Sequence, residues 1–315
     1  MRTFELKYPH SFEQGELPET VSAVGFFDGV HQGHQKVIET AVIEARERGM
    51  ESAVITFHPH PSVVLKGADQ VKYLTTLKEK QEIMEQMDVD RLYIIRFNKE
   101  LSSLSPQQFV DHFIIGLNIR HMVAGFDYSF GHKGQGSMDN LENYTRGFFT
   151  HTTVDKVTMD SEKVSSSRIR KLLVSGEMEQ ANELLGRPFI LEGLVIHGDQ
   201  RGKEIGYPTA NLQVDHDSLL PKPGIYAVKV NYKGATHYGM ANIGTNPTFT
   251  AEREDLSIEV NILDYDNDLY GEMLQVEWYR YIREEERFNG VKELVERIAQ
   301  DEREIRSFFA ANGME

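Results

Sequence analysis

Two histidines near the amino terminus are the first residues whose types and spacing could do chemistry. His31 and His34 close the segment GFFDGVHQGH, which begins at Gly25 and lies between a predicted strand and a predicted helix. A helix amino terminus offers free backbone amides and a positive dipole end, which favour a phosphate. Imidazole donors there can stabilise a nucleotidyl-transfer transition state, and Gly33 allows close backbone approach. A bare H-x-G-H is more often a turn or helix cap, but the flanking elements favour a phosphate site.

A serine-rich segment is a second candidate for phosphate binding. Ser165, Ser166 and Ser167 open a predicted helix, and Arg168 follows them directly. Hydroxyls, free amides and a guanidinium group at a helix start can hold a triphosphate. The segment alone favours the alternative, an ordinary serine cap with arginines in solvent. Beside the two histidines, triphosphate binding is the better interpretation.

A third loop combines aromatic rings with a carboxylate. It follows another predicted strand and contains Phe126, Asp127 and Tyr128 among glycines. Such a loop can bind a planar ring, although a glycine-rich surface hairpin fits its composition equally well. By contrast, His58 and His60 stand in a proline turn with no carboxylate nearby in sequence, so we do not expect a metal there.

Neutral oxygen ligands occur in a glycine-rich segment of the second half. Thr209 and Asn211 lie two residues apart on an extended stretch, so their oxygens share one face and could form part of a shell for ATP-bound Mg²⁺. We expect the preceding Gly198, Lys203 and Gly206 to contact ATP phosphates. The alternative is a turn leading into an edge strand, in which Asn211 bonds its own backbone.

A strand with alternating polarity provides a candidate base. Ile258, Val260 and Ile262 share one face of this predicted strand, and Glu259 therefore points to the other face. A kinase needs a carboxylate that can orient or deprotonate a substrate hydroxyl. A solvent-facing glutamate is the commoner alternative.

The elements of the first half must bring its loops together. Short apolar runs alternate with amphipathic helical runs; the apolar runs lie at 21–27, 52–57, 92–95 and 121–124, and the helical runs at about 34–48 and 76–87. Another helix begins at Ser105 as N-cap, with Pro106 in its first turn. This alternation predicts a doubly wound parallel α/β sheet, and the loops after Phe26, Phe57 and Gly125 should converge on one cleft.

The second half has the pattern of an all-β domain. Strand-length runs separated by turn residues predict an antiparallel barrel; they lie at 191–197, 225–231, 238–243, 257–263 and 273–281. A long helix with an apolar stripe should then cover the barrel; the stripe consists of Val291, Leu294, Val295, Ile298, Ile305, Phe308 and Phe309. Asp301 interrupts that stripe, and we expect it to form a polar tie to the barrel. A helix pair at 166–185 precedes the barrel, which places the domains at residues 1–186 and 187–315.

The composition excludes several functional classes. The 315 residues include 34 basic and 49 acidic side chains, a formal net charge of -15, which disfavours nucleic acid and anionic membranes as partners. The absence of cysteine excludes disulfides and thiolate chemistry and favours a cytoplasmic protein. No apolar run is long enough to span a membrane. We therefore expect small-molecule substrates and a monomer or weak homo-oligomer.

The motifs of the first half resemble the FMN adenylyltransferase module of bacterial bifunctional riboflavin kinase/FAD synthetases over residues 15–185. The resemblance implies a Rossmann-like H-x-G-H nucleotidyltransferase domain in which His31 and His34 stabilise the adenylyl-transfer transition state. It also implies ATP contacts from two groups of residues, which are Gly25, Phe26, Asp28 and Gly33 together with Ser165, Ser166, Ser167 and Arg168. By the same resemblance, Phe126, Asp127 and Tyr128 lie beside the flavin.

Residues 188–309 resemble the riboflavin kinase module of the same family. The resemblance implies a small antiparallel β-barrel with a C-terminal helix bordering the flavin. It further implies that Thr209 and Asn211 hold Mg²⁺ and that Glu259 is the base for the riboflavin 5′-hydroxyl. Two positions depart from the family pattern and concern affinity or rate: Asn261 stands where many relatives carry histidine, and Asn246 where a basic residue is frequent.

The expected function is a two-step synthesis of FAD. Riboflavin would be phosphorylated to FMN with Mg-ATP, and FMN would then be adenylylated with a second ATP to give FAD and pyrophosphate. Two alternatives remain open. One is an adenylyltransferase for another phosphorylated acceptor such as phosphopantetheine, which the second half of the chain disfavours. The other is a flavin-sensing protein whose barrel holds FMN without turnover.

Overall fold

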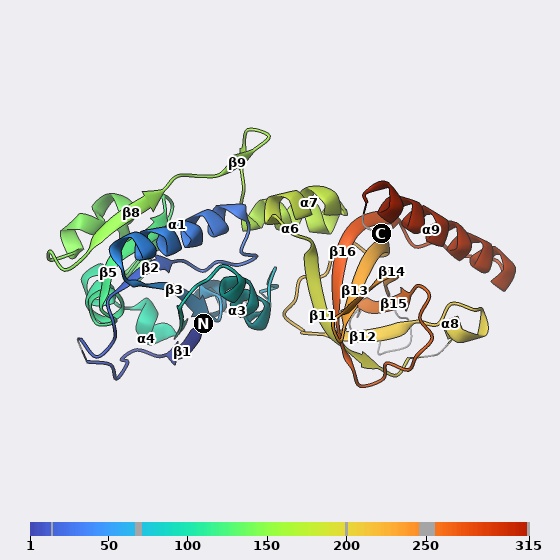
Figure 1. Cartoon of the computed structure of the whole chain (residues 1–315), viewed down its shortest axis with the longest axis horizontal. Coiled ribbons are helices and arrows are strands. Elements are labelled where there is room, and N and C mark those ends of the chain that lie inside the picture. The colour runs from blue at the N-terminus through green and yellow to red at the C-terminus, as the bar shows by residue number, and fades with distance from the viewer. Residues whose placement is uncertain (14, 67–70, 199–200, 246–255, 314–315) are drawn as a thin grey trace. The chain divides into compact units, whose positions relative to one another are not determined.

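The chain divides into an α/β unit and a unit built on a β-barrel (Figure 1). The computed structural model describes residues 1–13, 15–66, 71–198, 201–245 and 256–313. Contacts divide the chain into Met1–Ser166 and Ser167–Glu315.

A six-stranded parallel sheet organises the first unit. Its strand order is β1-β4-β3-β2-β5-β8, and every neighbouring pair is parallel. The strands are β1 (Arg2–Leu6), β2 (Thr20–Val24), β3 (Glu51–His58), β4 (Arg91–Arg96), β5 (Ile119–Gly125) and β8 (Thr150–Val154). The order reverses beside β2, and ligands of such sheets bind at the carboxyl ends of the strands near that reversal. The predicted parallel sheet is confirmed; its edge strands β1 and β8 were not predicted.

Short helices and hairpins connect these strands. The helical segments are α1 (Gln32–Arg48), α2 (Pro61–Lys66), α3 (Leu77–Gln86), α4 (Lys99–Ser102), α5 (Pro106–Phe109), the π-helical η1 (Val110–Ile115), and the 3-10 segments η2 (His132–Gly134) and η3 (Met138–Tyr144). The hairpins pair β6 (Ser129–Phe130) with β7 (Gly136–Ser137), and β9 (Thr158–Met159) with β10 (Glu162–Lys163). Ser105 caps α5 and Pro106 occupies its first turn, as predicted.

The two faces of the sheet bury separate apolar cores. On β3, Ile55 and Phe57 belong to one core, whereas Val54 belongs to the other. The first core includes Phe113 of η1, and the second includes Ile38 of α1. Side chains alternate along a strand, so this division places apolar layers on both faces, as a doubly wound sheet requires.

The second unit contains a closed antiparallel barrel, as predicted (Figure 1). Its strand order is β11-β12-β15-β14-β13-β16. The strands are β11 (Phe189–Ile196), β12 (Ala210–Val214), β13 (Gly224–Tyr232), β14 (Ala235–Thr245), β15 (Leu256–Ile262) and β16 (Met273–Arg283). The short helix α8 (Arg201–Glu204) lies between β11 and β12.

The final helix α9 (Val291–Ala311) packs on the barrel mainly through its second half. Ile305 and Phe309 are buried in one apolar cluster with Ala227 and Met240 of the barrel. Val291, at the start of the predicted stripe, is instead 63% exposed. The prediction that the helix covers the barrel is therefore confirmed for the stripe from Ile298 onward, because Ile298 and Phe308 also pack against this cluster.

A helix pair, α6 (Ser166–Ser175) and α7 (Met178–Leu185), precedes the barrel and packs on it. The side chain of Asn182 joins α7 to the barrel: its Nδ2 donates to the Trp278 carbonyl of β16 at 2.8 Å, and its Oδ1 accepts from the Phe189 amide of β11 at 2.8 Å. The division between the units falls just after Ser166, the first residue of α6, whereas the sequence predicts a boundary after the helix pair, at residue 186. That boundary stays a prediction.

Two candidate active sites

The two histidines of the H-x-G-H segment lie in direct contact at the start of α1. Their rings stack with centroids 3.6 Å apart and an interplanar angle of 17°. His31 is the N-cap of the helix, and its Nδ1 accepts a hydrogen bond from the His34 amide at 3.3 Å. A Cβ on Gly33 would lie 3.2 Å from Cε1 of His31, so glycine gives the imidazole its space. The expected imidazole pair at a helix start is therefore present.

The surroundings of His34 favour its neutral form. Burial is the main cause that lowers its pKa well below the usual value, and positive charge on His31, Lys80 and Lys163 acts in the same direction. The edge of the Phe27 ring closes one side, with ring centroids 5.4 Å apart. A neutral imidazole can donate one hydrogen bond without itself adding a charge to the site.

The loop between β2 and α1 is fixed by hydrogen bonds from several segments. Asp28 is buried, and its carboxylate accepts from the Leu74 amide at 3.0 Å. The Asp28 carbonyl accepts from the Ser166 hydroxyl at 2.9 Å, and the Gly29 amide donates to the Thr75 hydroxyl at 3.1 Å. These bonds show Asp28 and Ser166 holding the loop, and their contacts to ATP stay predictions.

The serine-rich segment lies at the division between the units. Ser166 is the first residue of α6 and belongs to the first unit, whereas Ser167 and Arg168 belong to the second. Ser167 is exposed, and Ser165 is half-buried. The structure thus brings Ser166 to the loop before α1, and phosphate binding by the other three residues stays a prediction.

The predicted ring-binding loop divides into an exposed and a packed part. Phe126 is 42% exposed, while Tyr128 packs against the core and its ring stacks on Phe130. Lys163 of β10 pairs with the Asp127 carboxylate, and its ammonium lies 4.7 Å from the Phe126 ring centroid. Flavin contacts from this loop stay predictions, and Lys163 is a charged neighbour that the sequence analysis did not single out.

A buried lysine beside the first site was also not predicted. Lys80 of α3 is only 3% exposed, and its Nζ donates to the carbonyl of Phe26 at 2.8 Å. The sequence carried a signal for it: Leu77, Lys80 and Met84 follow an i, i+3, i+7 spacing, which places the lysine on the apolar face of its helix.

The second site is a row of polar side chains across three barrel strands. Asn211 of β12 and Asn242 of β14 are the direct cross-strand partners of Glu259 of β15. The hydroxyl of Thr209 donates to the Glu259 carboxylate at 3.3 Å. Directly opposite residues in a sheet point to the same face, so the predicted ligands and the predicted base meet on one surface. Asn242 was not predicted, because nothing in its local pattern shows which residue it faces.

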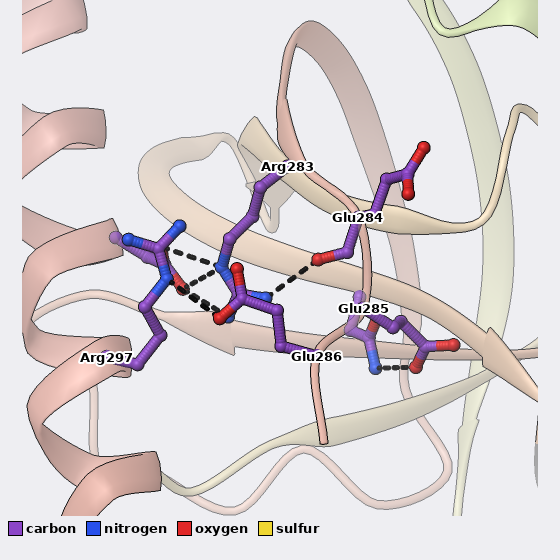
Figure 2. A network of polar contacts seen from close by, with 7 residues as sticks. Arg283, Glu284, Glu285, Glu286 and Arg297 are labelled. Carbon is purple, nitrogen blue, oxygen red and sulfur yellow. Dashed lines mark hydrogen bonds and ion pairs between the residues drawn. The ribbon is translucent and has the colours of Figure 1, made fainter. Parts of the chain in front are cut away.

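The side chain of Asn242 is held at one end only. Its Nδ2 donates to Glu285 Oε1 at 3.3 Å, a contact made by the loop after β16 (Figure 2). Its Oδ1 is buried and has no hydrogen-bond partner among the described residues. A buried acceptor without a partner is unfavourable, and a bound substrate hydroxyl or metal would satisfy it.

The glycine-rich segment before β12 packs closely around this row. A Cβ on Gly198 would lie 2.1 Å from Nδ2 of Asn211, so a side chain there would displace the Asn211 amide. Lys203 is exposed on α8, and Gly206 has φ of +86°, a conformation that favours glycine. Their ATP contacts stay predictions.

The two departures from the family pattern have different outcomes. Asn261 is buried, and its Nδ2 donates to the carbonyl of Pro208 at 2.7 Å, which anchors the segment that carries Thr209 and Asn211. Asn246 lies outside the described residues. Within the described part of the chain, no three His, Cys, Asp or Glu side chains are grouped so that they could hold a metal ion by themselves.

The fold and these sites together define a class of protein. One unit is a parallel α/β sheet with imidazoles at a helix start, and the other is a barrel with clustered hydroxyl, amide and carboxylate groups. These are the features of a two-site enzyme for nucleotidyl and phosphoryl transfer. Family models agree with this division, because the FAD synthetase model matches residues 13–168 and the riboflavin kinase model matches residues 185–309.

Full-length relatives carry both parts in the same order. The chain is 50% identical to the bifunctional riboflavin kinase/FMN adenylyltransferase of Listeria monocytogenes, covering 98% of this chain and 99% of that protein. The Bacillus subtilis enzyme of the same name is 46% identical, with 98% and 99% covered, and the Escherichia coli K12 enzyme is 34% identical, with 95% and 96% covered. The chain therefore belongs to the bifunctional riboflavin kinase/FMN adenylyltransferase family.

A solved structure shares the complete fold. It is described as a macrolide-efflux protein from Streptococcus pneumoniae, with a TM-score of 0.89 and 33% identity over 97% of this chain and 99% of that one. In the described part of the present chain, no helix combines the length and apolar character needed to cross a membrane.

Proposed function

We propose that the barrel unit phosphorylates riboflavin and that the α/β unit adenylylates the FMN produced, with ATP as the second substrate in both reactions. Membership of the bifunctional family supports the pair of activities. The observation that supports the assignment of residues is that the imidazole pair lies in the first unit and the pair of Thr209 and Glu259 lies in the second. The stacked imidazoles lie at the start of α1, and the Thr209–Glu259 contact lies on the barrel.

In the kinase reaction, Glu259 orients the 5′-hydroxyl of riboflavin and accepts its proton. The hydroxyl oxygen forms a bond to the γ-phosphorus, the bond to the bridging oxygen breaks, and ADP leaves. Thr209 donates to Glu259 and so fixes the carboxylate in place. Asn242, the cross-strand neighbour of Glu259, has an acceptor oxygen available for a substrate hydroxyl.

The residues of this site fit a magnesium ion. Thr209 and Asn211 are neutral oxygen ligands, which suit a cation whose charge ATP already balances. The buried oxygen of Asn242, which has no hydrogen-bond partner among the described residues, supports a ligand at this row. Thr209 and Asn211 would hold the ion. Bound Mg²⁺ would neutralise charge that develops on the phosphates.

In the transferase reaction, an FMN phosphate oxygen attacks the α-phosphorus of ATP and pyrophosphate leaves. The phosphate is already anionic, so the protein needs no general base there. His31 and His34 contribute hydrogen bonds and position, which requires the fixed stacked geometry that the helix cap provides.

Chromatography of flavins tests both activities. Purified protein is incubated with riboflavin, ATP and Mg²⁺, and a parallel reaction starts from FMN. We expect FMN followed by FAD in the first reaction and FAD in the second. If FAD forms in the reaction that starts from FMN but riboflavin is not converted, the alternative in which the barrel binds flavin without turnover is supported. If neither reaction yields a product, the proposal is contradicted.

Location and assembly are further proposals. Because both reactions consume ATP and the chain contains no cysteine, we place the enzyme in the cytoplasm. Its acidic net charge supports small-molecule partners over nucleic acid, and we expect a monomer or weak homo-oligomer.

A further inference from the structure

One backbone carbonyl before the histidines is held by two buried donors. The carbonyl oxygen of Phe26 accepts from Lys80 Nζ at 2.8 Å and from Thr56 Oγ1 at 2.9 Å. Lys80 is 3% exposed and Thr56 is fully buried. The ammonium also lies 4.5 Å from the centroid of the Phe26 ring. An ammonium group is costly to bury, and an apolar side chain would fill the same space, so the charge itself requires an explanation.

The loop that this lysine holds is conformationally strained. Phe27 has φ of +53° and Val30 has φ of +38°, and both are non-glycine residues in a region that side chains disfavour. Such a backbone conformation persists only when surrounding contacts determine it, and residues in such conformations cluster at functional sites. Here the loop leads directly into His31 and His34, so its shape sets the position of both imidazoles.

The same lysine brings positive charge to the transferase site. Its charge acts on His34 together with that of His31 on the same helix and of Lys163 on β10, while Asp28 in the strained loop is the acidic group that acts on Lys80. ATP brings several negative charges to such a site, and pyrophosphate leaves with them. A buried cation can stabilise such charge more strongly than one in water.

We propose that Lys80 is a positioning residue of adenylyl transfer: it fixes the strained loop through the Phe26 carbonyl and holds a buried positive charge against the loop that leads into His31 and His34. This inference rests on the proposed function of the first unit. It adds α3, an element outside the H-x-G-H segment, to the machinery of the transferase.

Three variants separate the charge from the hydrogen bond. Lys80→Met keeps the length of the side chain and removes both, whereas Lys80→Arg keeps the charge. Thr56→Val removes the second, neutral donor to the same carbonyl, together with a 3.5 Å hydrogen bond that Lys80 Nζ donates to the Thr56 hydroxyl. We expect Lys80→Met to lower kcat for FAD formation from FMN about 100-fold. Thr56→Val should cost about fivefold, and Lys80→Arg should retain more activity than Lys80→Met. The rate of FMN formation from riboflavin, measured on the same preparations, should stay at the wild-type value.

A pH profile distinguishes this role from a purely structural one. Burial lowers the pKa of Lys80 to about 8, so FAD formation by the wild type should decline as the ammonium loses its proton above that pH. In Lys80→Arg the guanidinium stays charged, and the alkaline decline should move to higher pH. In Lys80→Met the acid limb should move upward, because loss of a neighbouring positive charge makes His34 easier to protonate.

The outcomes are distinct. Wild-type rates of FAD formation in Lys80→Met would overturn the inference, and so would an alkaline limb that is identical in wild type and Lys80→Arg. Should Lys80→Met fail to fold, the Lys80→Arg profile still decides. Wild-type protein that forms no FAD would instead contradict the proposed function itself.

Discussion

His34 shows how burial can set the chemistry of a single side chain. It is enclosed by His31 and Phe27, and positive charges lower its pKa well below the usual value, in addition to the larger effect of burial. The imidazolium form is therefore disfavoured, and we expect a neutral ring throughout physiological pH. NMR titration of the histidine ring signals should show no protonation of His34 near pH 6.5, whereas an ordinary titration there would contradict this view.

Loss of the imidazole should affect one reaction only. His34→Ala removes a donor and its stacked partner surface, and we expect FAD formation from FMN to fall by about 10²–10³. FMN formation from riboflavin should be unchanged, because the proposed kinase residues lie on the barrel of the other unit. Rates of both reactions measured on one preparation provide the test and its internal control. An equal loss of both would show that the histidine acts on folding.

Glu259→Gln is the corresponding test of the barrel. The amide keeps the size of the side chain and an oxygen that can accept from Thr209, but it cannot take a proton from the riboflavin hydroxyl. We expect a decrease of about 10²–10⁴ in FMN formation, with FAD synthesis from supplied FMN retained. Kinase activity equal to that of the wild type would remove Glu259 from the mechanism.

The sequence identifies those residues whose role depends on neighbours only a few positions away. His31 and His34 are separated by one helical turn, and Thr209 and Asn211 by one strand repeat, so spacing alone predicts which side chains meet. Lys80 and Asn242 depend on contacts between segments far apart in the chain. Lys80 could be recognised as buried from its helical spacing, but its target, the Phe26 carbonyl, appears only in the structure.

The sequence pattern predicted the strands that are buried on both faces of the sheet and the helices that have one periodic apolar face. The central strands β2 to β5 and the helices α1 and α3 lie where the apolar patterns predicted them. The edge strands β1 and β8 were not predicted, because an edge strand needs less apolar sequence than a central one. The apolar stripe of α9 predicted a longer contact between the helix and the barrel than the structure has, because spacing does not show where the barrel surface ends.

The connection between β15 and the segment before β12 provides a prediction for these elements. Asn261 donates to the Pro208 carbonyl and so holds the strand start that presents Thr209. Asn261→Ala should loosen this segment and raise KM for Mg-ATP in the kinase reaction about fivefold, the value of one hydrogen bond. Asn261→His, the residue that the family resemblance suggests at this position, can donate again and should restore KM. Failure of the histidine variant to recover would show that asparagine has another role here.

At the scale of the whole molecule, the two proposed sites lie on units that each contain an apolar core of their own. The apolar clusters of the sheet and the cluster beneath α9 share no residue. The barrel unit has an ionic tie of its own: Asp301 of α9, 1% exposed, accepts from Arg283 Nη2 at 2.7 Å and from its Nε at 3.0 Å. Figure 2 shows Arg297 and Glu286 close to Arg283 in the same network. The predicted polar tie at Asp301 is thereby confirmed.

Asp301→Ala should lower the thermal stability of one unit and leave the other as it is. Removing one partner of a buried ion pair leaves Arg283 uncompensated and costs about 3–5 kcal/mol. At about 2–4 °C per kcal/mol for a unit of this size, the kinase should be inactivated at least ~6 °C below the wild-type temperature. FAD formation from FMN should persist to its original temperature, because the sheet unit keeps its own cores.

Asp264→Ala is the matched control, since it breaks an exposed pair with Arg306 of the same helix and should shift neither activity. A parallel loss of both activities in Asp301→Ala would show that the two units unfold as one.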